Sequence, residues 1–497
     1  MTPIAALLLA TLSIQGPTLA PGGCAAGRIL SEARAVTGGD RWNDVGEIIT
    51  EGGIDDAGAK GSFRAMRDLK TGRNAFKESL GVGRVAYIYD GHVRWEVDQA
   101  GGVHALSAPD SVARAITGAY LDRGVLWSDS PNDVKLRCVK TASEGDRAFD
   151  VIRVRPSEGS FADLWVDRKT HLIDRKIEQY PTTTMTERYA DYRRTDGLTL
   201  PYMMTRRYDD QSGAPTETQE VVRAYRVLRA ASATDFTRPP DPPPGHLVGH
   251  AHSIVVPISI DHGVTIFSAT IGRQGPFAFT FDPGAQGVLT TVASSRIGLA
   301  PGAMHRVRTI RIGDAEIDDI DLPIYGGAAT DLFPQRTIGL PPIAGSLGPE
   351  LLDRFDVRLN YSAKTATLAP LGDLRCSEAG TVERFVLQED DDIPLVHASI
   401  DGHDGLFQFD LRAPASLILF RPFDRRTGVA ISPSGAIHSL VIGGTRFRDV
   451  RVRFTTATTG KFASRTEAGL LGSGILSRFI TTIDYRDQTI CFEPPKN

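Results

Sequence analysis

Two aspartates follow matching apolar strands in the second half of this sequence, and they are the first residues placed to do chemistry. The segment GPFAFTFDPGAQG puts Asp282 after one strand, and GLFQFDLRAPAS puts Asp410 after the other. Either residue alone reads as an ordinary turn aspartate. Two carboxylates held about 3 Å apart cannot both ionise, so one can activate water as a base while the other, protonated, polarises a carbonyl group. The pair is therefore a candidate catalytic dyad.

The two aspartates belong to an internal repeat. The stretch GSLGPELLDRFDVRLNYSAKTATLAP, residues 345–370, returns as GLLGSGILSRFITTIDYRDQTICFEP, residues 469–494. The offset is constant, since Gly348 and Tyr361 both recur 124 positions later. Repetition of this kind constrains architecture more than local propensity does. It predicts two similar β lobes, born by duplication, that bring the two carboxylates together across a pseudo-twofold axis.

The two loops, each followed by a GxLG…L..RF…(N/D)Y block, resemble those of the bacterial pepsin/retropepsin-like aspartic peptidases. The resemblance covers roughly residues 254–492. In that family each lobe supplies a D-T-G loop, and the two aspartates share one proton and one lytic water. The resemblance implies catalytic roles for Asp282 and Asp410. It also implies four substrate-binding positions, which are Gly284, Ala285, Arg412 and Ala413.

Three residues depart from the D-T-G pattern. Pro283 and Leu411 replace the motif threonine, so neither loop has the hydroxyl that locks the loops together in the family. Arg412 stands where the family has glycine, and its guanidinium would favour an ionised Asp410. A permanently ionised dyad is poor at activating water. The segments LAPGAMHRV and AISPSGAIH also look too short for the flap that excludes water in the family. These departures favour peptide binding without efficient hydrolysis.

The first half of the chain has a different texture. ILSEARAVTGGDRW and SVARAITGAYLDRG predict two helices among short alternating strands such as VGEIITEGGI and VRWEVDQ. The segments TGGDRW, YDGHVRWEVD and DYRRTDGLTLPY resemble lipoprotein-carrier (LolA-type) domains, in which a curved sheet under helices surrounds acyl chains. The resemblance implies a lipid or another hydrophobic ligand. The alternative is that the four tryptophans, all in this half, simply fill its core.

The sequence divides into five expected segments. They are a signal peptide (1–26), a carrier-like α+β domain (27–235), a proline-rich linker (236–252) and two peptidase-like lobes (253–375 and 376–497). Residues 4–14 are apolar but too few to cross a bilayer, and Ala20 or Ala26 suits a cleavage site. The linker segment TRPPDPPPGH acts as a stiff spacer because proline at this density joins neither a helix nor a ladder. We therefore expect an exported protein, periplasmic or extracellular, without a transmembrane span.

Composition and the remaining motifs argue against several classes of function. Basic and acidic residues are nearly balanced, at 56 and 60, which disfavours nucleic acid as a partner. The chain has no Walker loop, dinucleotide fingerprint or G-x-S-x-G motif, so no cofactor is expected.

Metal binding is not expected from the sequence either. The histidines of GHLVGHAHS have no companion ligand at metal-binding spacing, and the acidic run at 389–392 lacks calcium-loop spacing. Cys376 and Cys491 suit a disulfide in an oxidising compartment. Cys138 would then be unpaired and buried.

Taken together, the sequence predicts a mostly β, α+β protein. Its N-terminal part is a curved-sheet half-barrel with helices, and its C-terminal part is a two-lobed all-β domain of the aspartic-peptidase type. Three functions remain open. They are binding of an extended peptide or protein segment between the lobes, peptide hydrolysis by Asp282 and Asp410, and transport of a lipid or other hydrophobic ligand.

Overall fold

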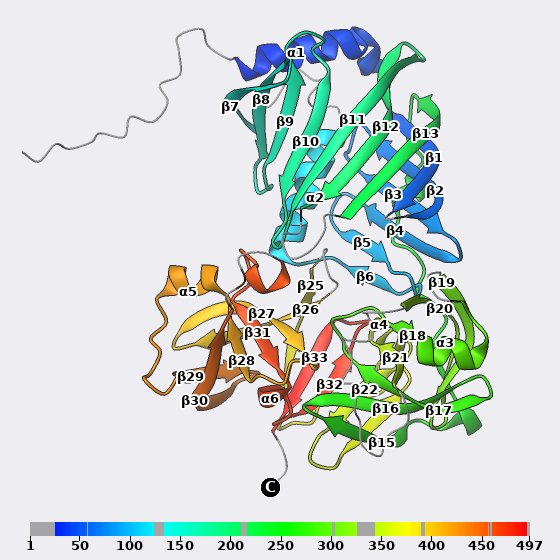
Figure 1. Ribbon diagram of the computed structural model, residues 1–497, viewed down its shortest axis with the longest axis vertical. Helices are drawn as coiled ribbons and strands as arrows, with labels where there is room; N and C mark the ends of the chain where they lie inside the picture. Colours follow the sequence, from blue (N-terminus) through cyan, green and yellow to red (C-terminus); the bar gives the residue numbers. More distant parts are fainter. Residues whose placement is uncertain are drawn as a thin grey trace, which may run out of the picture.

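The computed structural model describes residues 25–56, 58–123, 134–209, 216–300, 304–325, 343–388, 393–455, 457 and 460–494. The expected signal peptide and the acidic run at 389–392 therefore lie outside the described residues, except for residues 25 and 26. The chain is mostly β with a few helices, which confirms the predicted fold class. Its strands form three sheets, one in the upper part of Figure 1 and two below it.

The first sheet is a single antiparallel ribbon of 13 strands in the order β6-β5-β4-β3-β2-β1-β13-β12-β11-β10-β9-β8-β7. Its strands are β1 (Glu47–Asp56), β2 (Ala59–Asp68), β3 (Asn74–Leu80), β4 (Gly83–Tyr89), β5 (Arg94–Val97), β6 (Val103–Ala105), β7 (Val134–Glu144), β8 (Arg147–Pro156), β9 (Ala162–Asp167), β10 (Ile173–Gln179), β11 (Thr184–Thr195), β12 (Leu198–Tyr208) and β13 (Thr216–Leu228). Figure 1 shows the ribbon strongly curved, with β7 and β6 at its two ends.

Two helices accompany this sheet, both where the sequence predicts them. Helix α1 (Ala26–Thr37) packs Ile29 and Leu30 onto β8 and β9 and ends at Gly38, whose positive φ of 156° stops the helix. A short 3-10 turn, η1 (Gly39–Asp44), follows it. Helix α2 (Pro109–Asp122) begins with a proline in its first turn, where the missing N–H costs nothing. It lies in the hollow of the sheet, behind β10 and β11 in Figure 1.

The inward face of the first sheet carries polar as well as apolar side chains. Along β13, Thr218, Glu220 and Val222 are buried while the residues between them are exposed. This alternation is the period of two that places every second side chain on one face of a strand. The buried glutamate shows that the hollow is not a purely apolar core.

The second sheet follows the order β14-β20-β18-β21-β17-β16-β15-β23-β22-β32-β33-β24, with β19 beside β16 and β20. Its strands are β14 (His246–Leu247), β15 (Ile254–Asp261), β16 (Val264–Ile271), β17 (Gln274–Phe281), β18 (Val288–Thr290), β19 (Met304–Ile312), β20 (Ala315–Tyr325), β21 (Ile343–Leu347), β22 (Asp356–Asn360), β23 (Thr365–Ala369), β24 (Thr381–Arg384), β32 (Ile480–Asp484) and β33 (Thr489–Glu493). Helices α3 (Thr291–Ile297) and α4 (Pro349–Leu352) accompany them.

The third sheet has the order β25-β26-β27-β31-β28-β30-β29. Its strands are β25 (Val386–Leu387), β26 (Pro394–Ile400), β27 (His403–Asp410), β28 (Leu417–Leu419), β29 (Ala436–Ile442), β30 (Thr445–Phe454) and β31 (Gly469–Gly472). Helices α5 (Arg421–Thr427) and α6 (Ser473–Leu476) belong to this part of the chain. The second and third sheets each contain one aspartate loop, so together they form the two lobes.

A symmetric strand pair joins the lobes. Strands β22 and β32 run antiparallel, with Arg358 opposite Thr482, Val357 opposite Ile483 and Leu359 opposite Thr481. Adding the repeat offset of 124 to 358 gives 482, so the central pair consists of equivalent positions. An antiparallel pair that straddles a twofold axis must have this register. The repeat in the sequence therefore coincides with a local twofold relation in the structure.

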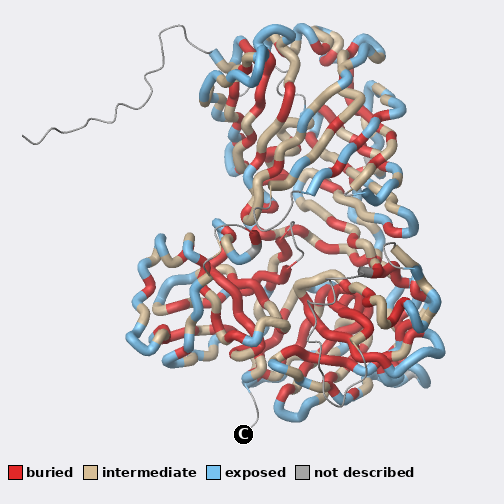
Figure 2. The backbone as a smooth tube through the Cα atoms, viewed as in Figure 1, coloured by how far each residue is buried: buried red, intermediate tan, exposed pale blue. Residues whose placement is uncertain are grey.

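The two lobes share one core, while the first sheet is divided among smaller clusters. The largest buried cluster extends through both lobes and includes Leu106, which follows β6 of the first sheet. Figure 2 shows buried residues concentrated along the strands of the lobes, and more half-buried ones along the first sheet. Core packing thus fixes the lobes to each other and draws one end of the first sheet against them.

The proline-rich segment is not a free spacer at its C-terminal end. His246 and Leu247 form β14, which pairs with Glu316 and Ala315 of β20. Two hydrogen bonds also join the first sheet to the lobes. Arg354 donates to the carbonyl oxygen of Ala100 (3.0 Å), and Gln488 donates to that of Ala105 (2.9 Å).

The cysteines depart in part from the sequence-based expectation. Cys376 and Cys491 form a disulfide, with Cα atoms 5.6 Å apart. Cys138 is disulfide-bonded as well and only half-buried, so the prediction of an unpaired, buried thiol is wrong.

Among the described residues, no helix combines the length and the apolar character that a membrane crossing requires.

Candidate functional site

Each lobe presents its aspartate at the end of a strand that lies parallel to a glycine-containing neighbour. Asp282 follows β17, which runs parallel to β21, and Asp410 ends β27, which runs parallel to β31. A Cβ atom on Gly348 would lie 2.3 Å from the carbonyl oxygens of Asp282 and Ala285, and Gly472 is equally crowded by the second loop. Both glycines are therefore needed because each aspartate loop passes directly over them.

Arg412 joins the two aspartates. Its backbone N–H donates to Oδ1 of Asp410 (2.8 Å), and its Nε lies 2.6 Å from Oδ2 of Asp282. Ala413 N–H also donates to Asp410 (3.0 Å), and Gly284 N–H donates to Oδ1 of Asp282 (3.1 Å). The structure thus brings together the two aspartates and the arginine that the sequence places in the second loop.

The arginine pairs with the opposite aspartate from the one expected. The sequence suggests that the guanidinium favours an ionised Asp410, whereas the side chain reaches across the lobes to Asp282. Asp282 is 2% exposed, and the Arg412 side chain 28%. An ion pair at this distance stabilises the ionised carboxylate, so Asp282 is a poor holder of the shared proton that a dyad needs.

A buried glutamate, Glu350, supports the loop that contains Asp282. Glu350 is 3% exposed, and its carboxylate accepts N–H groups from Gly287 (2.6 Å) and Gly348 (3.1 Å). Burial, reinforced by the charge of Asp98, raises the pKa of Glu350 to about 7. Sequence analysis missed this residue. The sequence signal that could have revealed Glu350 was a difference between the two repeats, because the second repeat has Gly474 at the equivalent position.

The hairpin after the first aspartate loop does not reach over Asp282. Strands β19 and β20 form this hairpin, and its end at Arg311 and Ile310 pairs with Thr270 and Ile271 of β16. In β16 the residue opposite Phe281, and so next to Asp282, is Thr265. The hairpin turn therefore lies some five residues, about 17 Å, along β16 from the aspartate. It is held there by β14.

A large cavity lies elsewhere, in the hollow of the first sheet, and has a volume of about 1030 Å³. Its apolar and aromatic lining includes Trp42, Met66, Phe76, Tyr87, Leu121, Leu164, Met185, Leu200 and Met204. Its charged lining includes Arg67, Arg94, Arg114, Asp122, Lys176, Glu178, Glu187 and Arg206. The cavity is therefore amphipathic, whereas the resemblance to carrier domains implies a hydrophobic ligand. Trp42 lines the cavity, while Trp165 packs in a core cluster with Phe149.

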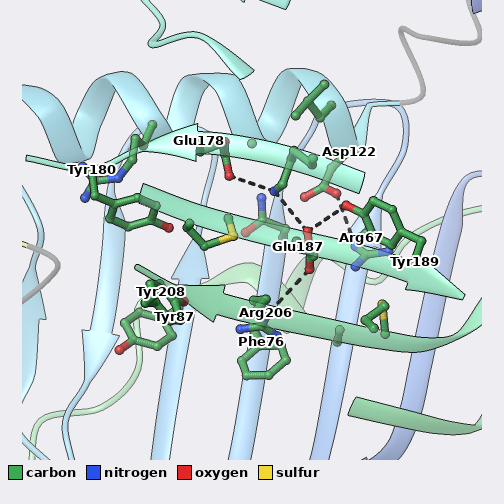
Figure 3. A pocket seen from close by; sticks show the side chains of 18 of the residues that line it. Arg67, Phe76, Tyr87, Asp122, Glu178, Tyr180, Glu187, Tyr189, Arg206 and Tyr208 are labelled. Carbon is green, nitrogen blue, oxygen red and sulfur yellow. Dashed lines mark hydrogen bonds and ion pairs between the residues drawn. The ribbon is translucent and has the colours of Figure 1, made fainter. Parts of the chain in front are cut away.

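The charged lining forms one ionic network around Glu187. Lys176 lies 3.3 Å from Glu187 and 2.9 Å from Glu178, and Arg206 lies 3.5 Å from Glu187 (Figure 3). Burial alone would raise the pKa of Glu187, but Lys176 and Arg206 outweigh it and lower that pKa to about 2. Beside this network, Arg67 pairs with Asp122 at 3.3 Å. Three of the cations of the lining are thus paired with its three carboxylates inside the cavity wall.

The third sheet contributes part of the cavity wall. Ala457, Gly460 and Phe462, from the segment after β30, line the cavity beside Tyr180 and Thr182 of the first sheet. Gly460 N–H donates to the carbonyl oxygen of Thr182 (3.3 Å). The Phe462 ring in turn lies 6.5 Å from that of Phe420, at 80° to it. Residues that follow β30 therefore complete the cavity wall.

Groups that could hold a metal ion lie away from the cavity. His246, which the sequence marks as an exposed histidine, pairs with Glu316 (2.6 Å) at the surface. Among the described residues, Cys376, Cys491 and Glu493 cluster, but the two thiols are used in the disulfide. A second cluster, Asp98, His104 and Asp353, is buried at the junction of the first sheet with the lobes.

Comparison with known proteins finds likeness in fold only. No protein-family profile and no curated protein matches this sequence. Solved structures that resemble it include a LolA superfamily protein from Nitrosomonas europaea, with 14% identity and a TM-score of 0.30 over 43% of this chain and 98% of that chain. A DUF1329 family protein from Desulfovibrio piger has 13% identity and a TM-score of 0.30 over 43% of this chain and 97% of that chain. An aspartic proteinase from Irpex lacteus has 10% identity and a TM-score of 0.34 over 49% of this chain and 98% of that chain. Both folds named from the sequence are represented, but these TM-scores are low, so function has to be argued from the sites.

Proposed function

We propose that this protein binds an amphipathic small molecule in the hollow of its first sheet. The observation that carries the proposal is the 1030 Å³ cavity with one apolar and one ionic side. Ligand pockets of about 300–1,000 Å³ enclose most of a drug-sized molecule. The cavity reaches the upper end of that range, so an elongated molecule such as a lipid fits its volume.

The lining defines the chemistry of the ligand. Met66, Met185 and Met204 give a flexible, polarisable surface that adapts to apolar bodies of different shape. The network of Lys176, Glu187 and neighbouring charges faces the same space. Because apolar and ionic groups face the same space, the ligand needs an apolar body and a polar, hydrogen-bonding end.

Gly118 offers a direct test of the cavity. It lines the hollow from α2, and a Cβ atom added to it meets no atom within 4 Å. Gly118→Trp should fill the cavity without displacing its neighbours, and leaving glycine should favour the helix by up to about 1 kcal/mol. We expect this variant to fold but to lose at least about tenfold in affinity for a fluorescent fatty acid. Gly118→Ala is the matched control and should bind like the wild type. Equal binding by all three proteins would refute the proposal.

The disulfides support export. Cys376–Cys491 and the bonded Cys138 account for all described cysteines, and such bonds persist mainly in oxidising compartments. We therefore place the protein in the periplasm or outside the cell. Detection in the periplasmic fraction of an expressing bacterium tests this, and retention in the cytoplasm with reduced thiols would contradict it.

The aspartate loops support a second candidate function, binding of an extended peptide without efficient hydrolysis. Gly284, Ala285, Arg412 and Ala413 are all half-exposed beside the buried Asp282, so backbone and guanidinium groups remain accessible to a peptide. The pairing of Arg412 with Asp282 opposes hydrolysis. A peptide library at acid pH should show no cleavage that pepstatin inhibits. Such cleavage, lost in Asp282→Ala, would instead establish a working aspartic dyad.

A further inference from the structure

The buried cluster of Asp98, His104 and Asp353 connects two distant parts of the chain. Asp98 follows β5 and His104 lies in β6 of the first sheet, while Asp353 follows α4 in the first lobe. Their exposed fractions are 2%, 3% and 8%. One ligand-type atom from each lies within 4.8 Å of the others. Charged side chains are almost never this deeply buried without a specific partner.

The His104 ring faces one oxygen of each carboxylate. His104 Nε2 lies 3.2 Å from Oδ2 of Asp98 and 3.4 Å from Oδ1 of Asp353. Charge-assisted N–H···O bonds measure about 2.7–2.9 Å, and a single N–H cannot point at two acceptors equally well. Ligands around a tetrahedral zinc ion, with metal–ligand bonds of about 2.0–2.1 Å, lie about 3.3–3.4 Å apart. Both observed separations match the edge of such a tetrahedron.

Further contacts prepare the carboxylates for a shared partner. Oδ2 of Asp353 is buried and makes no hydrogen bond within the described residues. A Cβ atom on Gly102 would lie 2.0 Å from this oxygen and 2.7 Å from Oδ2 of Asp98, so the glycine makes room for both carboxylates. Gly102 N–H fixes Asp98 by donating to its other oxygen at 2.7 Å. Outer contacts of this kind orient metal ligands.

Charge balance also suits a divalent cation. Two carboxylates and a neutral imidazole carry a charge of −2, which one divalent ion cancels. Arg354 and Glu350, which interact electrostatically with this cluster and with each other, contribute opposite charges. The buried region is then neutral as a whole, which burial in a low-dielectric interior requires.

We propose that Asp98, His104 and Asp353 bind one zinc-like divalent cation, which joins the first sheet to the first lobe. Three protein ligands leave one position of a tetrahedral zinc ion open. Because the ligands are buried and come from two parts of the chain, we assign the ion a role in holding the junction together. One imidazole and two carboxylates suit zinc and the neighbouring first-row metals. The ion would hold together the junction that Arg354–Ala100 and Gln488–Ala105 also bridge.

Zinc titration of the full chain, after removal of metal by a chelator, tests the proposal. We expect one zinc per chain by elemental analysis and a higher melting temperature on adding it back. His104→Gln and Asp353→Asn should weaken zinc binding at least about 100-fold, measured against a chromophoric chelator.

The control addresses the histidines of the segment GHLVGHAHS. The variant His246→Gln/His250→Gln/His252→Gln removes them and leaves the junction untouched, so it should bind zinc like the wild type. If zinc binding disappears in this triple variant, or if the wild type takes up no zinc, the proposal is overturned. If the wild type takes up no zinc, a proton on His104 is what holds the two carboxylates beside it.

A measurement on wild-type protein keeps the test decisive if His104→Gln does not fold. Cobalt(II) added to the metal-free chain should give the visible absorption of a site with fewer than six ligands, and one equivalent of zinc should abolish it. The triple variant should give the same spectrum. Absence of this absorption in both proteins would also overturn the proposal.

Discussion

Breaking the Arg412–Asp282 ion pair should cost stability and reveal how strongly the two lobes are coupled at their aspartates. With the charges about 4 Å apart and an effective dielectric constant of about 20, the attraction is about 4 kcal/mol. Solvent reaches 28% of the arginine side chain and screens part of this, while Asp282 at 2% exposure is almost fully desolvated. We expect a coupling energy of about 2 kcal/mol.

A double-mutant cycle with Arg412→Ala and Asp282→Ala measures this coupling by urea unfolding. Arg412→Ala alone should be the more costly change, because it leaves a buried carboxylate without its partner. The matched control is the pair Arg306–Asp321, joined by two hydrogen bonds of 2.9 and 2.8 Å. Arg306 is 54% exposed, against 28% for Arg412, so solvent screens this pair more strongly and it should couple by less than about 1 kcal/mol.

Two results would refute the reasoning. If the Arg412–Asp282 coupling is no larger than that of the control pair, the arginine does not hold the buried aspartate in its ionised form. If Arg412→Gly gains no pepstatin-sensitive hydrolysis even together with Leu411→Thr and Pro283→Thr, the arginine is not what limits catalysis. The displaced hairpin would then be the better explanation for an inactive site.

Three further outcomes follow from other parts of the structure. Phe462→Ala removes a ring that the third sheet places in the cavity wall, and it should weaken binding of a fluorescent fatty acid several-fold without changing the fold measured by circular dichroism. Burial raises the pKa of Glu78 to about 7, so the folded state holds a proton that the unfolded state has lost, and stability should fall by about 2–4 kcal/mol as pH rises from about 4.5 to 7. In Glu78→Gln the decline in urea unfolding curves should be smaller by this amount, with the part that comes from Glu350 remaining, and an unchanged decline would contradict the assignment. Replacing both Cys376 and Cys491 by alanine opens a loop of 115 residues and should cost about 3–5 kcal/mol, whereas a loss below about 1 kcal/mol would mean that the lobes do not depend on this bond.

The local sequence pattern was enough to predict several strands and helices. Alternating apolar residues predicted strands of the first sheet such as β1 and β5, and the helical pattern of ILSEARAVTGGDRW predicted α1. The 124-residue offset fits the symmetric register of β22 and β32, because equivalent strands that pair across a twofold axis must meet at equivalent positions. These are properties of the chain within one element, or of one repeat compared with its copy.

The sites depended on contacts that no local pattern records. The Arg412 side chain could have turned toward either aspartate, and only packing of the two lobes directs it to Asp282. Glu350 supports the first loop from a position where the second repeat has glycine, so symmetry gave no guidance.

The sequence by itself determined which strands form, where each aspartate loop lies and that the second half is repeated. The tertiary structure alone decided that an ionic network lines the hollow of the first sheet, that Phe462 lines it as well and that Asp98 and His104 meet Asp353. The physical reason is that strand periodicity fixes the face a side chain takes within its own sheet. Which distant face it then meets is set by how whole sheets pack.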